Sequence, residues 1–179
     1  MSFVHWFRGS NRRADSGKEH YETGLRLGRE NKWRDAVDYF TKALGISPFF
    51  VQARFARANA YFLIEEWDQA ISDFSHILLG NPKSVEALLG RASSYASKAA
   101  SMVERYQKTS GKQCRLSFEE LDMPMDQLLK SVSPEKALWI RTTNSIMELQ
   151  AAAKKDAKEI LELDPMNQLA QELLKNLSN

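Results

Sequence analysis

Two stretches of the chain, WRDAVDYFTKALGISP at residues 33–48 and WDQAISDFSHILLGNP at residues 67–82, share one pattern of residues. The residues that recur in register are Trp33 and Trp67, Ala36 and Ala70, Phe40 and Phe74, and Pro48 and Pro82. A fixed period of about 34 residues is typical of stacked copies of one supersecondary unit. Because proline has no backbone N–H to extend a helix, each stretch predicts a helix that ends before its closing proline.

A second helix is expected upstream of each of these stretches. Small residues recur there with the same period, at Gly24, Ala58 and Ala92. A larger residue follows each of them three positions later, on the same helical face, and these are Leu27, Tyr61 and Tyr95. We expect the small residues to let the neighbouring helix approach closely, so that the chain forms antiparallel helix pairs.

Together these positions resemble the tetratricopeptide repeat (TPR), a pair of helices that stacks on its neighbours. The resemblance spans residues 17–82 and, less closely, residues 83–96 and 150–177. It implies an all-α fold, a right-handed TPR α-solenoid. The implied divisions are an N-terminal basic and aromatic tail at 1–16, repeat one at 17–50, repeat two at 51–84, repeat three at 85–165 with an insertion at about 98–145, and a C-terminal capping helix at 166–179.

The third repeat is interrupted. Its first helix starts on schedule with VEALLGRASSYA at residues 85–96, but the next closing proline after Pro82 is Pro165, much further along than one repeat allows. Measured against a period of about 34 residues, this spacing leaves an insertion of about 49 residues. Because an apolar stripe continues to Tyr106 and Ser133-Pro134 is a favourable helix start, we expect two long antiparallel helices that extend beyond the solenoid.

The tip of this insertion is expected to join the two long helices. The sequence predicts a loop, KTSGKQC at residues 108–114, a capping box at Ser117 and Glu120, and a short helix near residues 123–130. The apolar residues of the tip are Phe118, Leu121, Met123, Met125, Leu128 and Leu129. Two interpretations stay open: this group folds back onto the long helices, or its outer face is a second binding surface.

TPR proteins generally bind extended peptides along the concave surface formed by the first helix of each pair, so the resemblance also implies a partner-binding face. By position in the repeat, the residues of this face are Tyr21, Leu25, Arg29, Phe55, Asn59, Phe62, Leu89 and Ser93. Aromatic and aliphatic side chains with a few polar groups are what a peptide site requires. The alternative is that Tyr21, Phe55 and Phe62 pack against the capping helix or the N-terminal tail.

One group of TPR domains binds the terminal carboxylates of chaperones through a clamp of Lys, Asn and Arg side chains. The matching positions here are Tyr21, Leu25, Ala56, Glu86 and Gly90, and none carries the expected residue. Arginines at positions 54, 57 and 91 are close by but fall on another helical phase. The sequence therefore disfavours chaperone tails as partners.

The sequence offers no recognisable catalytic, cofactor or metal site, and we expect a protein that is not an enzyme. His5, His20, His76 and Cys114 show no metal-ligand spacing. No P-loop, HExxH or GxSxG motif occurs. Acidic residues are expected mainly on the solvent faces of helices, beside Lys or Arg. Catalysis ranks third, after protein binding and RNA binding.

The charge of the chain is nearly balanced, with 25 Lys and Arg against 23 Asp and Glu, which argues against nucleic acid as the main partner. The RNA-binding alternative depends on a basic and aromatic N-terminal end, with arginines at positions 8, 12, 13, 26, 29, 54 and 57. Acidic residues between them, Glu19, Glu22 and Glu30, weaken it. The interpretation preferred from the sequence is a protein-interaction module, an adaptor, scaffold or assembly factor, that binds a peptide or helix of a larger complex.

Two features bear on the compartment. No apolar run reaches the roughly 18 residues of a membrane span, so no transmembrane segment is expected. The single cysteine, Cys114, suits a reducing compartment, and a cytoplasmic protein is expected. The first residues, MSFVHWFRGSNRRA at 1–14, carry arginines and no acid, as transit peptides do, so an organelle (mitochondrial or plastid) is the alternative.

Overall fold

The computed structural model describes residues 3–110 and 123–178 of the chain. The described residues form helices and loops, with no strand among them. The helices are α1 (Phe3–Arg29), α2 (Trp33–Ile46), α3 (Val51–Leu63), α4 (Trp67–Gly80), α5 (Val85–Ser110), α7 (Met125–Ser131), α8 (Pro134–Leu163) and α9 (Gln168–Asn176). The predicted all-α class is confirmed.

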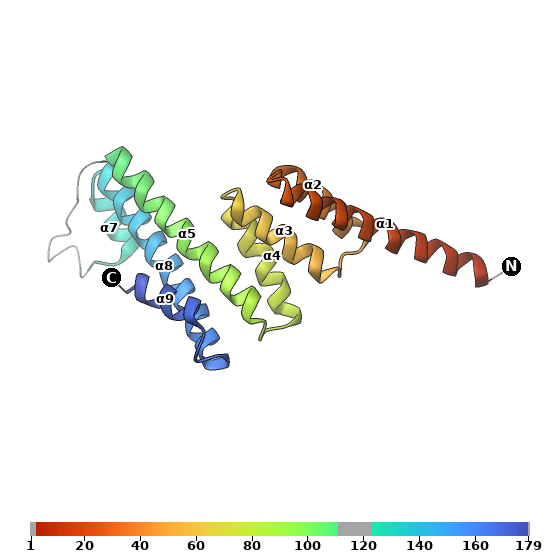
Figure 1. Ribbon diagram of the computed structural model, residues 1–179. Coiled ribbons are helices and arrows are strands. Elements are labelled where there is room, and N and C mark those ends of the chain that lie inside the picture. Colours follow the sequence, from red (N-terminus) through yellow and green to blue (C-terminus); the bar gives the residue numbers. More distant parts are fainter. Residues whose placement is uncertain (1–2, 111–122, 179) are drawn as a thin grey trace.

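The helices stack in the order in which the chain supplies them (Figure 1). α1 packs on α2, α2 on α3, α3 on α4 and α4 on α5, and then α5 pairs with α8, which carries α9. Contacts between neighbours along the chain are the mark of a solenoid, in which each unit buries its apolar face on the next. The structure thus shows the α-solenoid that the repeat period predicts.

The small residues of the repeat lie at the helix contacts, as the sequence predicts. Ala58 and Ala92 have no exposed surface, and neither do Ala36 and Ala70 on the facing helices. A Cβ atom added to Gly24 would stand 2.5 Å from the ring of Phe40, so a larger residue at this position must displace the ring. The close approach of the helices, and with it the repeat register, therefore depends on these side chains being small.

The turn inside each of the first two helix pairs is short and has the same conformation. Asn31 and Glu65, which occupy the same position in successive repeats, both have a positive φ, of 58° and 63°. This left-handed conformation reverses the chain between the first and second helix of a pair. In the third pair, helix α5 continues through the equivalent position.

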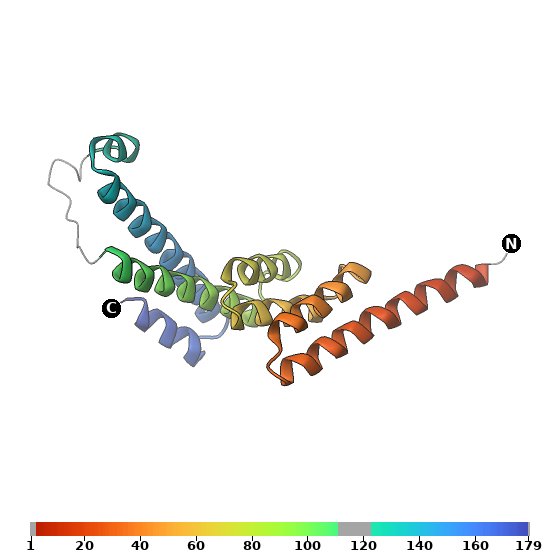
Figure 2. The ribbon, with the colours of Figure 1, turned by 90° about the horizontal axis from the view of Figure 1, so that it is seen from above.

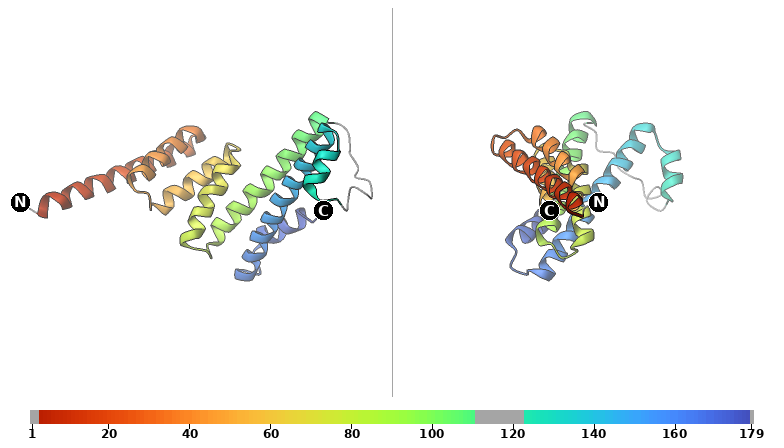
Figure 3. Two further views of the ribbon diagram at one scale, coloured as in Figure 1. Left: turned by 180° about the vertical axis from the view of Figure 1, so that it is seen from behind. Right: turned by 90° about the vertical axis from the view of Figure 1, so that its right-hand side faces the viewer.

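The long helices of the third pair are α5 and α8, which lie side by side and antiparallel (Figure 1). α8 starts where the sequence predicts, because the Ser133 side chain accepts a hydrogen bond of 3.3 Å from the Lys136 backbone N–H and Pro134 occupies the first turn. α5 and α8 diverge toward the end at which α7 lies (Figure 2 and Figure 3, right). The predicted capping box at Ser117 and Glu120, together with Cys114, lies outside the described residues.

We propose two regular repeats (α1–α4), a split repeat (α5 and α8, with α7 at their tip) and a capping helix (α9). The sequence predicts a tail at residues 1–16, whereas residues 3–16 are helical in the structure. They belong to the backbone of α1, which projects beyond α2 (Figure 3). No proline interrupts this segment, and a helix that is already nucleated extends easily along such a chain.

Candidate functional site

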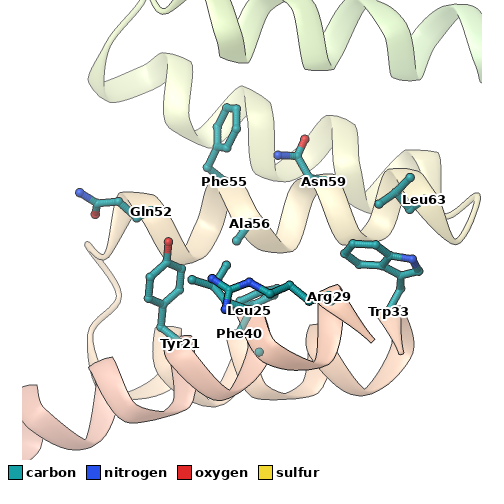
Figure 4. Close-up of a pocket in the computed structure, with 12 residues that line it drawn as sticks. Tyr21, Leu25, Arg29, Trp33, Phe40, Gln52, Phe55, Ala56, Asn59 and Leu63 are labelled. Carbon is teal, nitrogen blue, oxygen red and sulfur yellow. The ribbon is translucent and has the colours of Figure 1, made fainter. Parts of the chain in front are cut away.

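Helices α1, α2 and α3 enclose a groove of about 520 Å³ (Figure 4). Its lining residues are Tyr21, Gly24, Leu25, Gly28, Arg29, Trp33, Phe40, Gln52, Phe55, Ala56, Asn59 and Leu63. Figure 4 shows Tyr21, Leu25 and Arg29 rising from α1, and Phe55 and Asn59 rising from α3. Residues four apart on a helix share one face, and this spacing gives the groove its two side-chain rows.

The aromatic side chains of this groove are held in place by other rings. The Tyr21 ring centroid lies 4.9 Å from that of Phe50 and 5.9 Å from that of Phe40. The Phe55 ring meets Phe74 edge to face, with 5.7 Å between centroids. Both Tyr21 and Phe55 are half-buried, so each presents part of a fixed ring to the groove. Rigid, partly exposed aromatic rings are suitable anchors for a ligand because little conformational freedom is lost on binding.

The polar side chains of the groove have no partner within the described part of the chain. The Tyr21 hydroxyl, the Arg29 guanidinium and the side-chain amides of Gln52 and Asn59 all lack an intramolecular hydrogen bond or ion pair there. Asn59 has both a carbonyl acceptor and an amide donor, so it can pair with the backbone of an extended peptide.

Phe55 also borders a second hollow, of about 450 Å³, between α3, α4 and α5. The other residues that line it are Val51, Ile77, Gly80, Asn81, Ser84 and Glu86. Glu86 accepts a hydrogen bond of 3.2 Å from the Ser84 hydroxyl. Phe55 therefore stands between a hollow that contains a cation, Arg29, and one that contains an anion, Glu86.

The structure brings together five of the eight residues predicted for the partner-binding face: Tyr21, Leu25, Arg29, Phe55 and Asn59. Phe62 does not line this groove; like Phe55, it packs against the core cluster that contains Phe74. Leu89 and Ser93 line a separate small hollow of about 200 Å³ that α9 helps to form, through Leu169, Glu172, Leu173 and Asn176. The capping helix therefore occupies part of the surface that the resemblance assigns to a ligand.

In the sequence, Trp33 was only a marker of the repeat and was not included in the partner-binding face, whereas in the structure it lines the groove. The signal was present in Gly28, where an added Cβ would stand 2.8 Å from the Trp33 ring. A glycine opposite a tryptophan leaves room for the ring to lie against helix α1 and to form the end of the groove.

Two buried carboxylates are exceptions among the acidic residues, most of which are exposed in the described part of the chain, as expected. Asp73 is 5% exposed and Asp156 is 2% exposed. The hydrogen bonds that Arg57 donates to Asp73 raise the pKa of Arg57 above its ordinary value, and those that Arg91 donates to Asp156 do the same for Arg91. Arg54 also contacts Asp73, at 3.4 Å. Arg54 and Arg57 are therefore engaged in ion pairs inside the solenoid, which weakens the RNA-binding interpretation that counted them as part of a basic surface.

The described residues offer little for other kinds of site. No group of three or more His, Cys, Asp and Glu side chains is placed among them to hold a metal ion. Within the same residues, no helix is long and apolar enough to span a membrane. Cys114 and the side chain of His5 lie outside the described part of the chain.

The chain resembles solved TPR domains in structure. The first TPR domain of Spaghetti (RPAP3), bound to the HSP90 peptide SRMEEVD, superposes with a TM-score of 0.59 at 19% identity, over 92% of each chain. The Arabidopsis OM64 TPR domain matches with a TM-score of 0.59 at 19% identity, over 93% of this chain and 97% of that one. The second TPR domain of human RPAP3, in complex with the HSP70 peptide SGPTIEEVD, matches with a TM-score of 0.57 at 16% identity, over 95% of this chain and 98% of that one.

No family model matches the chain, and no curated protein matches it. The structural likeness nevertheless agrees with the repeating pattern of tryptophan, small residues and proline. The chain therefore has the tetratricopeptide-repeat fold.

Proposed function

We propose that this chain is a protein-interaction module without catalytic activity, which binds an extended peptide or a helix of a larger protein in the groove formed by α1, α2 and α3. The observation that carries the proposal is the combination found in this groove. Tyr21 and Phe55 offer fixed aromatic surface, and Arg29, Gln52 and Asn59 offer polar groups without intramolecular partners in the described residues. Concave apolar surface with a few unsatisfied polar groups is the usual character of a ligand site.

The structural neighbours supply an analogy and also one alternative ligand. Two of them hold chaperone peptides that end in EEVD. At the clamp positions, this chain has the uncharged residues Leu25, Ala56 and Gly90. A Cβ atom at Gly90 would collide with the Phe74 ring, so this position has no room for the arginine of a clamp. The shared fold does not exclude a chaperone tail, and a peptide ending in EEVD therefore belongs in the binding experiment.

The test is capture of partners by the tagged protein, read by mass spectrometry, followed by the affinity of the peptides identified. We expect the double variant Phe55→Ala/Asn59→Ala to lose at least about tenfold in affinity, the scale of a hot-spot residue. The control is Leu79→Ala, because Leu79 is 82% exposed and lies outside the groove. Both variants should keep the helical circular dichroism and melting of the wild type.

Undiminished binding by a folded double variant would contradict the groove as the site. The insertion is then the next surface to examine, because Leu138, Met147 and Met125 are exposed on α7 and α8. A variant in which residues 99–144 are replaced by a short flexible turn would show whether recognition depends on that surface.

A further inference from the structure

We propose that the groove selects peptides in which an aspartate or glutamate side chain lies beside an apolar residue, with Arg29 binding the carboxylate. This inference rests on the proposed function and specifies the chemistry of its ligand. The apolar residue lies against Tyr21 and Phe55, and the acidic residue lies on the α1 side of Phe55.

Arg29 differs from the other basic residues of the same helix. Arg26 forms an ion pair of 2.9 Å with Glu30, and Lys18 forms one of 3.7 Å with Glu22. Arg29 has no such partner among the described residues. The helical positions that could supply one, three and four residues away, hold Leu25, Arg26, Lys32 and Trp33, none of them acidic. The described part of the chain therefore leaves this guanidinium available for a ligand.

The surroundings of Arg29 favour an anion. The described residues that line the groove include no carboxylate, so nothing there competes for the guanidinium. Its neighbours Leu25 and Trp33 are half-buried apolar side chains. Arg29 itself is exposed, so a carboxylate can reach it, and a guanidinium can hold a carboxylate through two parallel hydrogen bonds.

A side-chain carboxylate fits this site better than the end of a chain. A C-terminal acidic residue presents two carboxylates close together, whereas Arg29 is the only cation in the lining of the groove as described. The second carboxylate would find no cation in the described lining, only the neutral donors of Tyr21, Gln52 and Asn59, which bind a carboxylate less strongly than a guanidinium does. On the other side of Phe55, Glu86 repels an acidic residue, so the position of the acid relative to the apolar anchor is also specified.

The experiment uses acetylated and amidated peptides that contain one aromatic or leucine anchor and either Glu, Gln or Lys at one neighbouring position, scanned on both sides. The same peptides with a free C-terminal carboxylate, and a peptide ending in EEVD, are measured beside them. We expect the best Glu peptide to bind the wild type about tenfold more tightly than its Gln counterpart. In Arg29→Gln, the Glu and Gln peptides should bind equally, at the affinity of the Gln peptide for the wild type. Arg26→Gln is the matched control and should keep the preference.

The outcomes separate this inference from the function on which it rests. If Glu and Gln peptides bind the wild type equally, and Phe55→Ala/Asn59→Ala abolishes both, the groove is the site but the acidic preference is wrong. If Arg29→Gln retains the preference, another residue recognises the acid and the assignment to Arg29 is wrong. If binding requires a free C-terminal carboxylate, including that of an EEVD peptide, the ligand is a chain end and the inference is wrong. If no peptide binds the wild type, both proposals fail.

Discussion

The regular repeats and the split repeat use the same polar contact at their junctions, although the chain reaches it over very different distances. In the second regular repeat, Arg57 donates hydrogen bonds of 2.7 and 2.8 Å to the two oxygens of Asp73 and one of 3.1 Å to Thr41. In the split repeat, Arg91 donates hydrogen bonds of 2.7 and 2.8 Å to Asp156 and one of 3.3 Å to Ser75. Each arginine thus joins its own repeat to the one before it.

The difference between the two junctions lies in the chain between the partners. Arg57 and Asp73 are 16 residues apart, whereas Arg91 and Asp156 are 65 residues apart. The additional separation between Arg91 and Asp156 equals the length of the insertion that the spacing of Pro82 and Pro165 indicates. The extra chain enters where the regular repeats have their turns at Asn31 and Glu65, so it extends two helices without changing their packing. A solenoid therefore tolerates a long insertion at a turn as long as the helix contacts are kept.

The largest effect is expected from removing either buried carboxylate. Asp73→Ala and Asp156→Ala should each lower the free energy of unfolding by about 3–5 kcal/mol, because each leaves a partly buried guanidinium without its counterion. The measurement is urea denaturation followed by circular dichroism. Asp68→Ala is the control, since Asp68 is 72% exposed where it meets Lys98, and such a pair contributes at most about 1 kcal/mol. Wild-type stability of Asp156→Ala would show that the two junctions are not equivalent.

A smaller loss is expected from overpacking the helix contact. Ala70 and Ala153 occupy the same repeat position and have no exposed surface. Ala70→Leu and Ala153→Leu should each cost about 1–3 kcal/mol, since extra methylenes force neighbouring side chains and helices apart. Ala151→Leu is the control, because Ala151 is exposed on the same helix as Ala153. If Ala153→Leu melts like the wild type while Ala70→Leu does not, the register of the split repeat is wrong.

Shortening the insertion should affect the solenoid less than either aspartate variant does. Replacing residues 99–144 with a short flexible turn removes the tip and keeps Arg91, Asp156 and the buried Ile160. Because repeats contact only their neighbours, we expect a folded domain with a single cooperative transition in thermal and urea unfolding. Failure of this shortened chain to fold would show that the long helices are required by the solenoid itself.

The smallest effects concern two exposed glutamates, Glu30 in the regular repeats and Glu104 in the split repeat. Hydrogen bonds from Lys32 lower the pKa of Glu30 below 4.5, with help from Arg26, and Lys108 alone lowers the pKa of Glu104. A carboxyl group with a lowered pKa stabilises the fold above pH 4.5, and this contribution is lost as the pH falls through the lowered value. NMR titration should show Lys108→Gln restoring an ordinary pKa to Glu104, whereas Lys32→Gln restores that of Glu30 only in part. Full recovery of the pKa of Glu30 in Lys32→Gln would contradict the contribution of Arg26.

The sequence by itself determined the architecture of this protein, because the signals involved are local and repeated. The offset between Trp33 and Trp67 specified the period, and Gly24, Ala58 and Ala92 specified where helices touch. The proline spacing indicated the length of the insertion, and Ser133-Pro134 marked the start of α8. Each of these depends on backbone chemistry or on side-chain size within one repeat, so no knowledge of distant contacts was needed.

Only the tertiary structure decided which side chains remain free. Leu89 and Ser93 were predicted on the same face as Phe55, yet α9 lies beside them, and Phe62 does not line the groove. From the sequence, Asp73 and Asp156 are expected on the surface like other acidic residues. In the structure each is buried and accepts hydrogen bonds from an arginine of a neighbouring helix. Arg29 remained without a partner for the opposite reason, because no described carboxylate forms an ion pair with it and none lines its groove. Whether a group is exposed, paired or covered depends on the helices that pack around it, and those contacts join residues far apart in the chain.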